Sequence, residues 1–267
     1  MKRLAAILFC LVSLFCTASA EGIEHECTLW LQYGGKWQQD RYLTPLLYSG
    51  QTAGVGGEWR QMFRRTQDWT HCGGLYVSGA FFLNKPRQNV IYSLGVQTGW
   101  GADYNFQRRL SVKGLNLFLG PYLDFDYAGR LQGISVNKPY SMDMGLSLCL
   151  HTGLSWRFLA RRSNYRLSYD LVTSALGVVY VPEYWESYYE LSKHLSDGFA
   201  FASLHNRQTV RHMLALDMQF RHSAWKVGVR HEYVHYFIHG IRMRREEVSL
   251  VIGMVFQYTT KIRPFRW

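Results

Sequence analysis

Residues 142–158 read MDMGLSLCLHTGLSWRF, and along this stretch apolar residues alternate with small, polar or charged ones. Because successive side chains of a strand point to opposite faces, a period of two predicts a β-strand. The stretch is far longer than the roughly five or six residues usual for strands of soluble proteins. One face is apolar and ends in Trp156 and Phe158, while the other carries Asp143, His151 and Arg157 among small residues. This pattern is typical of a barrel wall with lipid outside and water inside.

The same alternation recurs along the rest of the chain. Clear segments span residues 90–104, 115–127, 165–171, 225–233 and 248–258, and weaker ones span 25–34, 51–64, 70–83 and 208–221. We therefore expect an all-β fold, a closed antiparallel transmembrane β-barrel of about ten strands, with roughly 8 to 12 left open.

The links between these segments support an even strand number. Links near residues 65–69, 105–109, 159–162 and 222–223 are short, whereas those near 35–50, 128–139, 181–207 and 239–245 are longer. The link at 84–88 is short but falls on the side of the longer links. Short periplasmic turns and longer extracellular loops alternate in outer-membrane barrels. Ten strands would place both chain termini in the periplasm and every long link outside.

The N-terminus has the features of a secretory signal peptide. Lys2 and Arg3 precede an apolar run over residues 4–15, and Ala18-Ser19-Ala20 is a small-x-small cleavage site. The apolar run is shorter than the roughly 20 residues that a transmembrane helix needs. We expect residues 1–20 to be removed and residues 21–267 to form one barrel domain. A secreted chain without helical spans can still cross a membrane as a closed barrel, so the predicted location is the outer membrane of a Gram-negative cell.

Composition and charge indicate the expected partners. Aromatic residues make up 16% of the chain, as aromatic girdles at both membrane interfaces require. The formal charge of +11 falls to +9 when Lys2 and Arg3 are lost. This basic balance suits outer-membrane lipid, the phosphates of lipopolysaccharide, or another small-molecule or surface ligand, although basic loops that only solvate the barrel ends would give the same charge. The signal peptide argues against nucleic acid as a partner.

The cysteines do not form a complete disulfide framework. Cys10 and Cys16 lie in the signal peptide, so the mature chain keeps Cys27, Cys72 and Cys149, which is an odd number. A bridge between Cys27 and Cys72 stays open in an oxidising compartment. Cys149 is expected to be a small lumen residue. No CxxC or metal-finger spacing occurs, and we expect neither a metal ion nor a cofactor.

Two carboxylates are the weak catalytic candidates. Asp124 and Asp126 lie two residues apart on one face of a predicted strand, where paired carboxylates could share a proton or activate water. The alternative is an ion network with lumen arginines, since narrow barrels are filled with side chains. The charged or titratable residues that we expect in such a lumen network are Glu58, Asp143, His151, Arg157, Arg166, Asp170, Arg230 and Glu232.

Three histidines recur at every fourth position but do not suggest a metal site. On a strand, His231, His235 and His239 share one face, and neighbouring members are roughly 13 Å apart at about 3.3 Å per residue. One ion cannot bridge that distance, so we expect these histidines at the barrel rim.

A short segment near the mature N-terminus resembles a known group of barrels. Residues 41–46 read Arg-Tyr-Leu-Thr-Pro-Leu and are followed by Tyr48-Ser49-Gly50. They resemble a segment of small outer-membrane barrels from uncharacterised Bacteroidota families, in which Tyr-Leu-Ser-Pro-Leu precedes Tyr-x-Gly; here Thr44 replaces the serine. The resemblance covers about ten residues and implies a barrel but no activity. The chain also ends in the aromatic Trp267, as barrel proteins read by the barrel assembly machinery commonly do.

Three classes of function remain at this stage. A structural or surface-binding barrel that acts through basic, aromatic extracellular loops is the first choice, and an enzymatic role is not expected. A narrow channel for small solutes or ions is the alternative, and an outer-membrane hydrolase that acts on lipid or peptide at the extracellular rim is the third. A filled, charge-paired lumen would favour the first, a continuous axial gap the second, and a close carboxylate–His or Ser–His pair in a rim cleft the third.

Overall fold

The structure is a computed structural model that describes residues 23–41, 43, 46–63, 68–84, 89–110, 112–133, 140–160, 163–181, 198–220 and 223–260. Several expectations lie outside these residues: the signal peptide with Cys10 and Cys16, the tail at 261–267 with Trp267, and Tyr42, Thr44 and Pro45 of the Bacteroidota-like segment. The described residues contain no helix that is long and apolar enough to cross a membrane.

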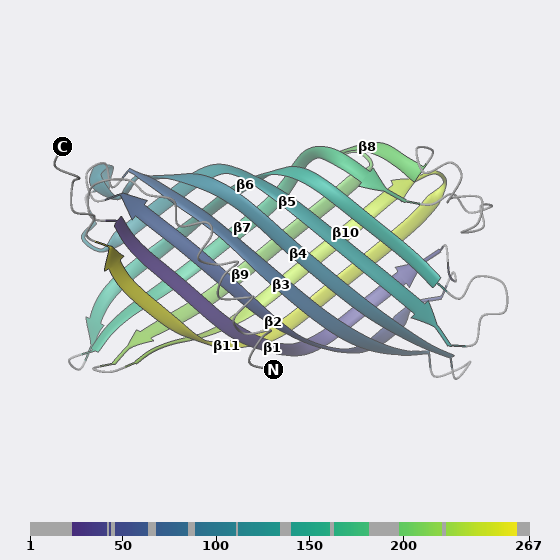
Figure 1. Cartoon of the computed structure of the whole chain (residues 1–267), viewed down its shortest axis with the longest axis horizontal. Helices are drawn as coiled ribbons and strands as arrows, with labels where there is room; N and C mark the ends of the chain where they lie inside the picture. The colour runs from purple at the N-terminus through teal and green to yellow at the C-terminus, as the bar shows by residue number, and fades with distance from the viewer. Residues whose placement is uncertain are drawn as a thin grey trace, which may run out of the picture.

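The described chain is almost entirely β-structure (Figure 1). The elements in order are β1 (Ile23–Asp40), β2 (Tyr48–Phe63), β3 (Trp69–Asn84), β4 (Asn89–Asn105), the 3-10 turn η2 (Gln107–Arg109), β5 (Leu115–Gln132), β6 (Tyr140–Ala160), β7 (Ser163–Tyr180), β8 (Phe199–Ser203), β9 (Arg207–Gln219), β10 (Ala224–Ile238) and β11 (Ile241–Thr260).

The strands form one closed antiparallel barrel. From β1 to β8 and from β9 to β11, each strand pairs with the next along the chain, β9 pairs with β7, and β1 pairs with β11 to close the ring. β8 and β9 pair with successive parts of β7, residues 176–180 and 164–173 respectively, and so occupy a single position in the wall. The wall therefore has ten strand positions, and the predicted fold is confirmed.

The two ends of the barrel differ in their connections. We call the end that carries Ile23, Thr260 and the links at 64–68, 106–114, 161–162 and 220–223 the turn end, and the opposite end the loop end (Figure 1). The strands run further toward the loop end than the sequence predicts: β1 continues to Asp40 and β5 to Gln132, and part of the link expected at 181–207 forms β8.

The prediction of a longer link at residues 239–245 is wrong. His239 and Gly240 alone connect β10 to β11, with φ angles of 50° and 72°. Two positive φ angles are typical of the type I′ hairpin turn, which matches the twist of the flanking strands. The period-two pattern resumes at once, because Ile241, Met243 and Arg245 are buried in the lumen. The expected short link near 105–109 also differs, since it contains η2 and extends to Gly114.

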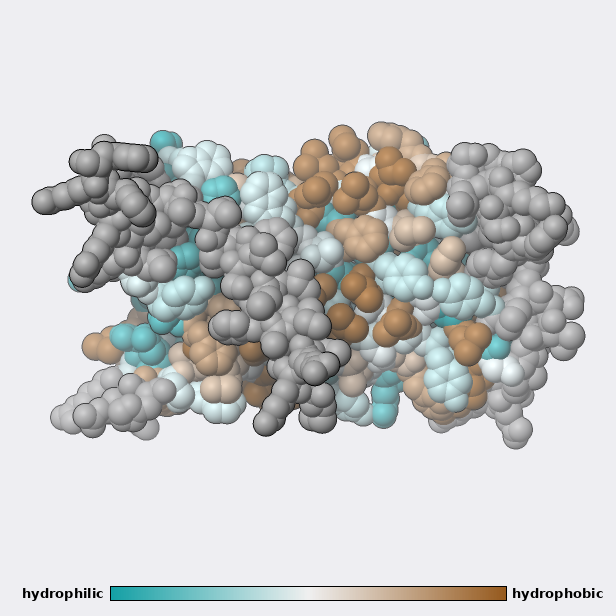
Figure 2. All heavy atoms as spheres, viewed as in Figure 1, coloured by the Kyte–Doolittle hydropathy of each residue, from teal (hydrophilic) through white to brown (hydrophobic). Residues whose placement is uncertain are grey.

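The outer face of the wall is apolar and exposed. Along β6 the outward row includes Leu146, Leu150 and Trp156, each between 45% and 48% exposed, while Asp143 and His151 on the inward row are buried. Figure 2 shows hydrophobic side chains spread over the wall between the two ends. The alternation read from residues 142–158 thus separates an apolar outside from a polar inside.

The loop end of the lumen is filled by apolar side chains. One buried cluster contains Val179, Val181, Ala202, Val234, Tyr236, Ile238, Ile241 and Met243, and a second contains Tyr48, Ala80, Phe82 and Ile91. Leu43, in the link between β1 and β2, packs against both clusters. Water is therefore displaced from the described loop end of the lumen by packed side chains.

Candidate functional site

The middle of the lumen is filled by a charge network around Glu232. Its carboxylate accepts hydrogen bonds from Arg230 at 2.6 Å, Arg245 at 2.7 Å and Gln97 at 3.0 Å. Arg230 also lies over the ring of Tyr76, with 4.3 Å from its guanidinium carbon to the ring centroid. Four strands thus contribute to one cross-section of the lumen, and all of these side chains are buried.

Glu247 forms a second layer next to this network. Lys36 makes an ion pair with it at 2.9 Å, and Gln32 donates a hydrogen bond to it at 2.6 Å. Toward the loop end, Arg130 lies between Asp40, at 3.1 Å, and Asp143. Charged side chains this deeply buried are tolerated because each one has a partner of opposite charge.

The two catalytic candidates are each held by an arginine. Asp124 makes an ion pair with Arg211, and Asp126 accepts a hydrogen bond from Arg207 at 2.5 Å. Both carboxylates are buried in the lumen wall on β5. Each carboxylate thus has a guanidinium partner, as in the ion network that was the alternative to a catalytic pair.

The turn end of the lumen opens into a cavity of about 710 Å³, which we call the vestibule. Its lining includes Glu26, Arg60, Asp103, Asn116 and Arg166. Arg166 donates to both oxygens of Glu26, at 2.8 and 2.5 Å, and to Asp217 at 2.7 Å. The vestibule is therefore polar and wet, unlike the apolar loop end.

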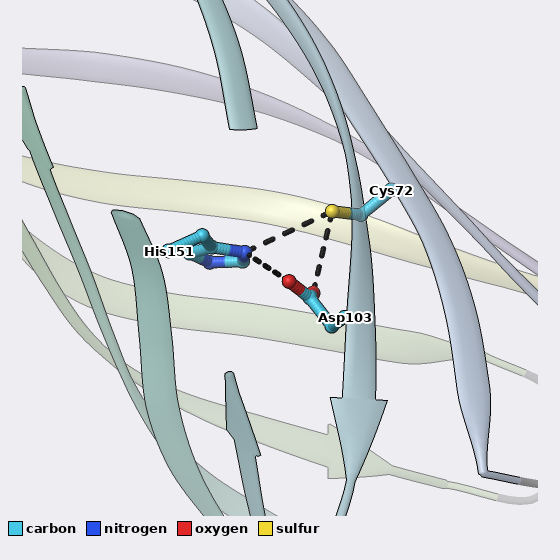
Figure 3. Close-up of side chains that lie close together, drawn as sticks. All are labelled: Cys72, Asp103 and His151. Atoms are coloured by element: carbon cyan, nitrogen blue, oxygen red, sulfur yellow. Dashed lines mark hydrogen bonds and ion pairs between the residues drawn. The ribbon is translucent and has the colours of Figure 1, made fainter. Parts of the chain in front are cut away.

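Three side chains from three strands meet where the vestibule ends. Cys72 on β3, Asp103 on β4 and His151 on β6 point toward one another inside the barrel (Figure 3). Nδ1 of His151 lies 2.9 Å from Oδ1 of Asp103 and 3.8 Å from Sγ of Cys72, and Sγ lies 3.3 Å from Oδ2 of Asp103. All three side chains are buried. We call this group the Cys–Asp–His cluster.

A glycine on the intervening strand lets His151 reach the other two residues. Gly120 on β5 pairs directly with His151, and a Cβ atom added to it would lie 2.8 Å from the Cα atom of Asp103. A larger residue would separate β4 from β5 or occupy the space that the cluster uses. Cys72 pairs with Gly101 and Thr70 with Asp103, so Cys72 and Asp103 are diagonal neighbours on the inward face of β3 and β4.

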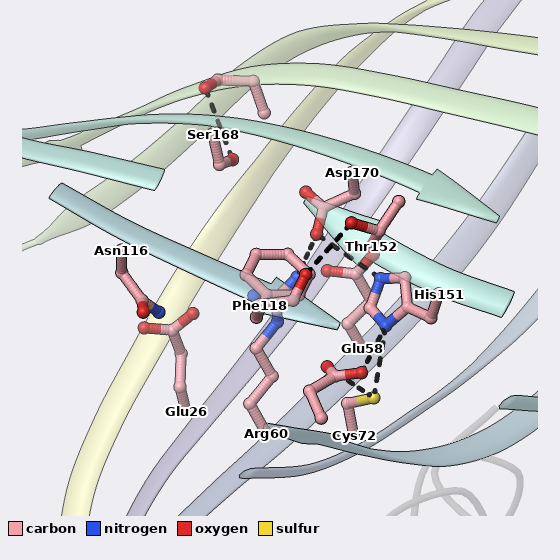
Figure 4. Close-up of polar contacts among 12 residues, drawn as sticks. Glu26, Glu58, Arg60, Cys72, Asn116, Phe118, His151, Thr152, Ser168 and Asp170 are labelled. Atoms are coloured by element: carbon pink, nitrogen blue, oxygen red, sulfur yellow. Dashed lines mark hydrogen bonds and ion pairs between the residues drawn. The ribbon is translucent and has the colours of Figure 1, made fainter. Parts of the chain in front are cut away.

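A second carboxylate and an arginine lie behind the histidine (Figure 4). Oδ1 of Asp170 is 3.7 Å from Nε2 of His151, and Arg60 donates to the same oxygen at 2.6 Å. Arg60 also lies over the ring of Phe118, and Phe118 and Tyr122 both contact the imidazole ring. These contacts hold the orientation of His151. A cavity of about 100 Å³, lined by Arg60, Cys72, His151 and Asp170 among others, adjoins the cluster.

The structure separates the residues predicted for the lumen network into groups. Arg230 with Glu232 lies in the middle, Asp143 lies toward the loop end, and four others lie toward the turn end: Glu58, His151, Arg166 and Asp170. Glu58 pairs with Lys226 at 3.3 Å. Arg157 lies apart from these groups. It is exposed, lines the vestibule, and has no ion pair with any residue that the structure describes.

The Cys–Asp–His cluster was not predicted as a site. Its members share no local spacing, because they lie on three different strands; the available signal was only that each occupies an inward position. The Cys27–Cys72 bridge considered from the sequence is not formed, and none of Cys27, Cys72 and Cys149 is part of a disulfide. Cys27 alternates with the buried Thr28 and shares the outward row with Leu29, whereas Cys72 faces the lumen, so their side chains lie on opposite faces of the wall.

The histidines at every fourth position do not meet either. His231 stacks on His212 of the neighbouring strand, with 5.5 Å between ring centroids, and lies 3.4 Å from Glu246 on the outer face. His239 lies in the β10–β11 turn, where its Nδ1 atom is 3.0 Å from the carbonyl oxygen of Val181.

Comparison with known proteins places the chain in a family. The family model described as "Protein of unknown function (DUF3316)" matches residues 5–263. The chain belongs to the DUF3316 family. A search of curated proteins gives no match.

Solved structures of similar architecture are outer-membrane barrels of low sequence identity. The outer membrane protease OmpT from Escherichia coli is 7% identical with a TM-score of 0.47, over 91% of this chain and 99% of that one. The transport unit of the autotransporter AIDA-I from Escherichia coli is 9% identical with a TM-score of 0.42, over 93% of both chains. Ail, the attachment invasion locus protein of Yersinia pestis, is 11% identical with a TM-score of 0.35, over 88% of this chain and 99% of that chain.

Proposed function

We propose that this member of the DUF3316 family is an integral outer-membrane β-barrel with a structural or surface-binding role. The exposed apolar outer face supports the membrane location, because soluble monomers rarely expose large contiguous apolar patches. Aromatic pairs lie near both ends of the wall, as membrane interfaces favour. Trp69 packs against Tyr104 at the turn end and Phe81 against Tyr92 at the loop end, with ring centroids 5.3 and 5.5 Å apart.

The filled lumen is the observation that supports this role over a channel. Arg130 is 1% exposed although it carries a full charge, and it lies between Asp40 and Asp143 next to the apolar loop end. A solute path along the axis would have to separate these ion pairs and the packed clusters beyond them. Removing one partner from such a buried pair costs about 3–5 kcal/mol, which makes spontaneous opening rare.

Single-channel conductance in a planar bilayer tests the closed lumen. The refolded mature barrel, shown to be folded by its resistance to heat on a gel, should give no steady current steps at any voltage. An open porin added to the same bilayer provides the positive control. Reproducible steps from the folded wild-type barrel would overturn the proposal in favour of a channel.

We propose that the barrel surface binds the phosphates of lipopolysaccharide in the outer leaflet. Arg242 and Arg244 lie on the outward row of β11 near the loop end, stacked over Phe237 and Tyr233 respectively. A groove of about 290 Å³ adjoins Arg244, and Trp37, Leu47 and Glu246 also line it. Guanidinium groups pair well with phosphate, and the neighbouring aromatic rings suit the depth at which headgroups lie.

Binding of purified lipopolysaccharide to the barrel in detergent tests this role. Lipopolysaccharide should raise the unfolding temperature of the wild-type barrel, whereas the neutral phospholipid phosphatidylethanolamine should not. The double variant Arg242→Gln with Arg244→Gln should show a smaller rise with lipopolysaccharide. Arg109→Gln is the matched control, because Arg109 stacks over Tyr104 in the same way but at the turn end. An equal loss of stabilisation in the control, or none in the double variant, would contradict the proposed site. The assembly machinery remains a proposed partner through Trp267.

A further inference from the structure

We propose that Cys72, Asp103 and His151 bind a divalent transition-metal ion, with zinc the best fit, inside the barrel at the inner end of the vestibule. This inference goes beyond the proposed structural and surface-binding role. It rests on four observations: the spacing of the three donor atoms, the carboxylate behind the histidine, the charge of the cluster, and its access to water.

The spacing of the donor atoms matches a tetrahedral ion. Zinc binds sulfur at about 2.3 Å and nitrogen or oxygen at about 2.0–2.2 Å, so its ligand atoms lie about 3.3–3.6 Å from one another. In the cluster, Nδ1 of His151 lies 2.9 Å from Oδ1 of Asp103 and 3.8 Å from Sγ of Cys72, and Sγ lies 3.3 Å from the other carboxylate oxygen, Oδ2. One donor atom from each residue lies within 4.8 Å of the other two, so small side-chain rotations would bring the three donors to the ligand positions (Figure 3).

The arrangement of the three side chains around the imidazole ring differs from that of a catalytic relay. In a nucleophile–histidine–acid relay, the nucleophile and the acid contact opposite nitrogens of the ring. Here Cys72 and Asp103 both approach Nδ1 of His151. Nδ1 carries at most one proton, which Oδ1 of Asp103 can accept, and the Cys72 thiol donates to Oδ2 of Asp103, so neither hydrogen bond needs the 3.8 Å approach of Sγ to Nδ1. A metal ion at the centre would be bound by Sγ, Nδ1 and a carboxylate oxygen together.

Asp170 occupies the position expected of an outer partner. Histidines that ligate a metal commonly donate their other ring N–H to a carboxylate, which fixes the tautomer and the ring orientation. Nε2 of His151 faces Asp170 at 3.7 Å, and Arg60 holds that carboxylate at 2.6 Å (Figure 4). His151 would thus bind through Nδ1 and point its remaining proton toward Asp170.

The charge of the cluster suits a dication. Arg60 and Asp170 neutralise each other, which leaves the Asp103 carboxylate and, once Cys72 releases its proton to solvent on binding, one thiolate to balance two positive charges. Cys and His together with a carboxylate favour zinc and its neighbours over calcium or magnesium, which prefer oxygen ligands.

Access and a fourth ligand position come from the two cavities. Asp103 and Arg60 line the vestibule, so an ion can reach the cluster through water from the turn end. The smaller cavity of about 100 Å³ adjoins Cys72 and His151 and has room for a water molecule as fourth ligand. Three protein ligands and one exchangeable position are typical of zinc sites that are not purely structural.

Cobalt(II) titration of the refolded, chelator-treated barrel is the first test, because cobalt replaces zinc and gives a thiolate charge-transfer absorption. We expect one cobalt ion per barrel, displaced by zinc, with that absorption present. Cys149→Ser is the matched control: Cys149 is a buried lumen cysteine on β6 outside the cluster, and its loss should change neither stoichiometry nor spectrum. A folded wild-type barrel that gives no thiolate absorption with cobalt would overturn the proposal.

Three variants separate this site from adventitious binding by exposed histidines. Loss of outer partners typically lowers metal affinity about 10–100-fold, so Asp170→Asn should weaken zinc binding about 10-fold and Cys72→Ser at least about 100-fold. His151→Gln serves as the second ligand variant if Cys72→Ser fails to fold, with folding judged by heat resistance on a gel. Unchanged zinc affinity in any folded ligand variant would assign the bound metal to surface histidines and refute the site.

Discussion

Glu232 is the residue on which the charge balance of the middle lumen depends. It accepts hydrogen bonds from Arg230 and Arg245, and all three side chains are buried. Its removal would leave two guanidinium groups without their shared partner in a space that water hardly enters. Because breaking a buried pair costs about 3–5 kcal/mol, Glu232→Ala should lower the free energy of unfolding by roughly that amount. Urea unfolding of the refolded barrel in detergent measures it.

The matched control is a glutamate on the outer face of the barrel wall. Glu246 pairs with Arg244 at 3.3 Å on the outward row of β11, where both side chains are at least one third exposed. Exposed pairs contribute about 0–1 kcal/mol, so Glu246→Ala should change stability little. Equal effects of the two substitutions would mean that water reaches Glu232 and that side chains do not fill the middle of the lumen.

The two-residue turn between β10 and β11 depends on residues that tolerate positive φ angles. Gly240 has φ of 72° and His239 has φ of 50°, and a residue with a Cβ atom costs about 1–2 kcal/mol in this left-handed region. Gly240→Ala should therefore destabilise the barrel by about 1 kcal/mol. His239→Asn should be neutral or stabilising, because Asn-Gly is the preferred pair for a type I′ turn. Urea unfolding measures the free energy of unfolding of both variants. A Gly240→Ala variant as stable as wild type would show that the turn has another conformation.

The strands of the barrel could be predicted from the sequence more readily than the positions at which they end. The rows of β6 and β4 show a period of two throughout, so their existence and inward faces follow from the residues alone. The ends were missed because inward positions near the loop end are apolar, as in Ile241 and Met243, while Arg242 and Arg244 lie on the outward row, so the contrast between the two faces is reversed there. The Cys–Asp–His cluster was missed for a different reason. Strand register decides which inward residues meet, and Cys72, Asp103 and His151 meet only because β5 places Gly120 between them.

The barrel as a whole is asymmetric along its axis, with an apolar, filled loop end and a wet vestibule at the turn end. Its orientation in the membrane therefore decides which compartment reaches the lumen. An even number of strand positions puts both described chain ends, Ile23 and Thr260, at the turn end. Outer-membrane barrels keep their termini in the periplasm, so the vestibule should face the periplasm and the filled end should face the outside.

Single-cysteine labelling of intact cells tests this orientation. In a background with Cys27, Cys72 and Cys149 replaced by serine, His205→Cys in the exposed link between β8 and β9 should react with a membrane-impermeant maleimide. Lys113→Cys, equally exposed but next to η2 at the turn end, should react only after the outer membrane is permeabilised. The reverse pattern would place the vestibule on the cell surface. The Cys–Asp–His cluster would then be reached by external rather than periplasmic metal, because the filled loop end separates the cluster from the opposite compartment in either orientation.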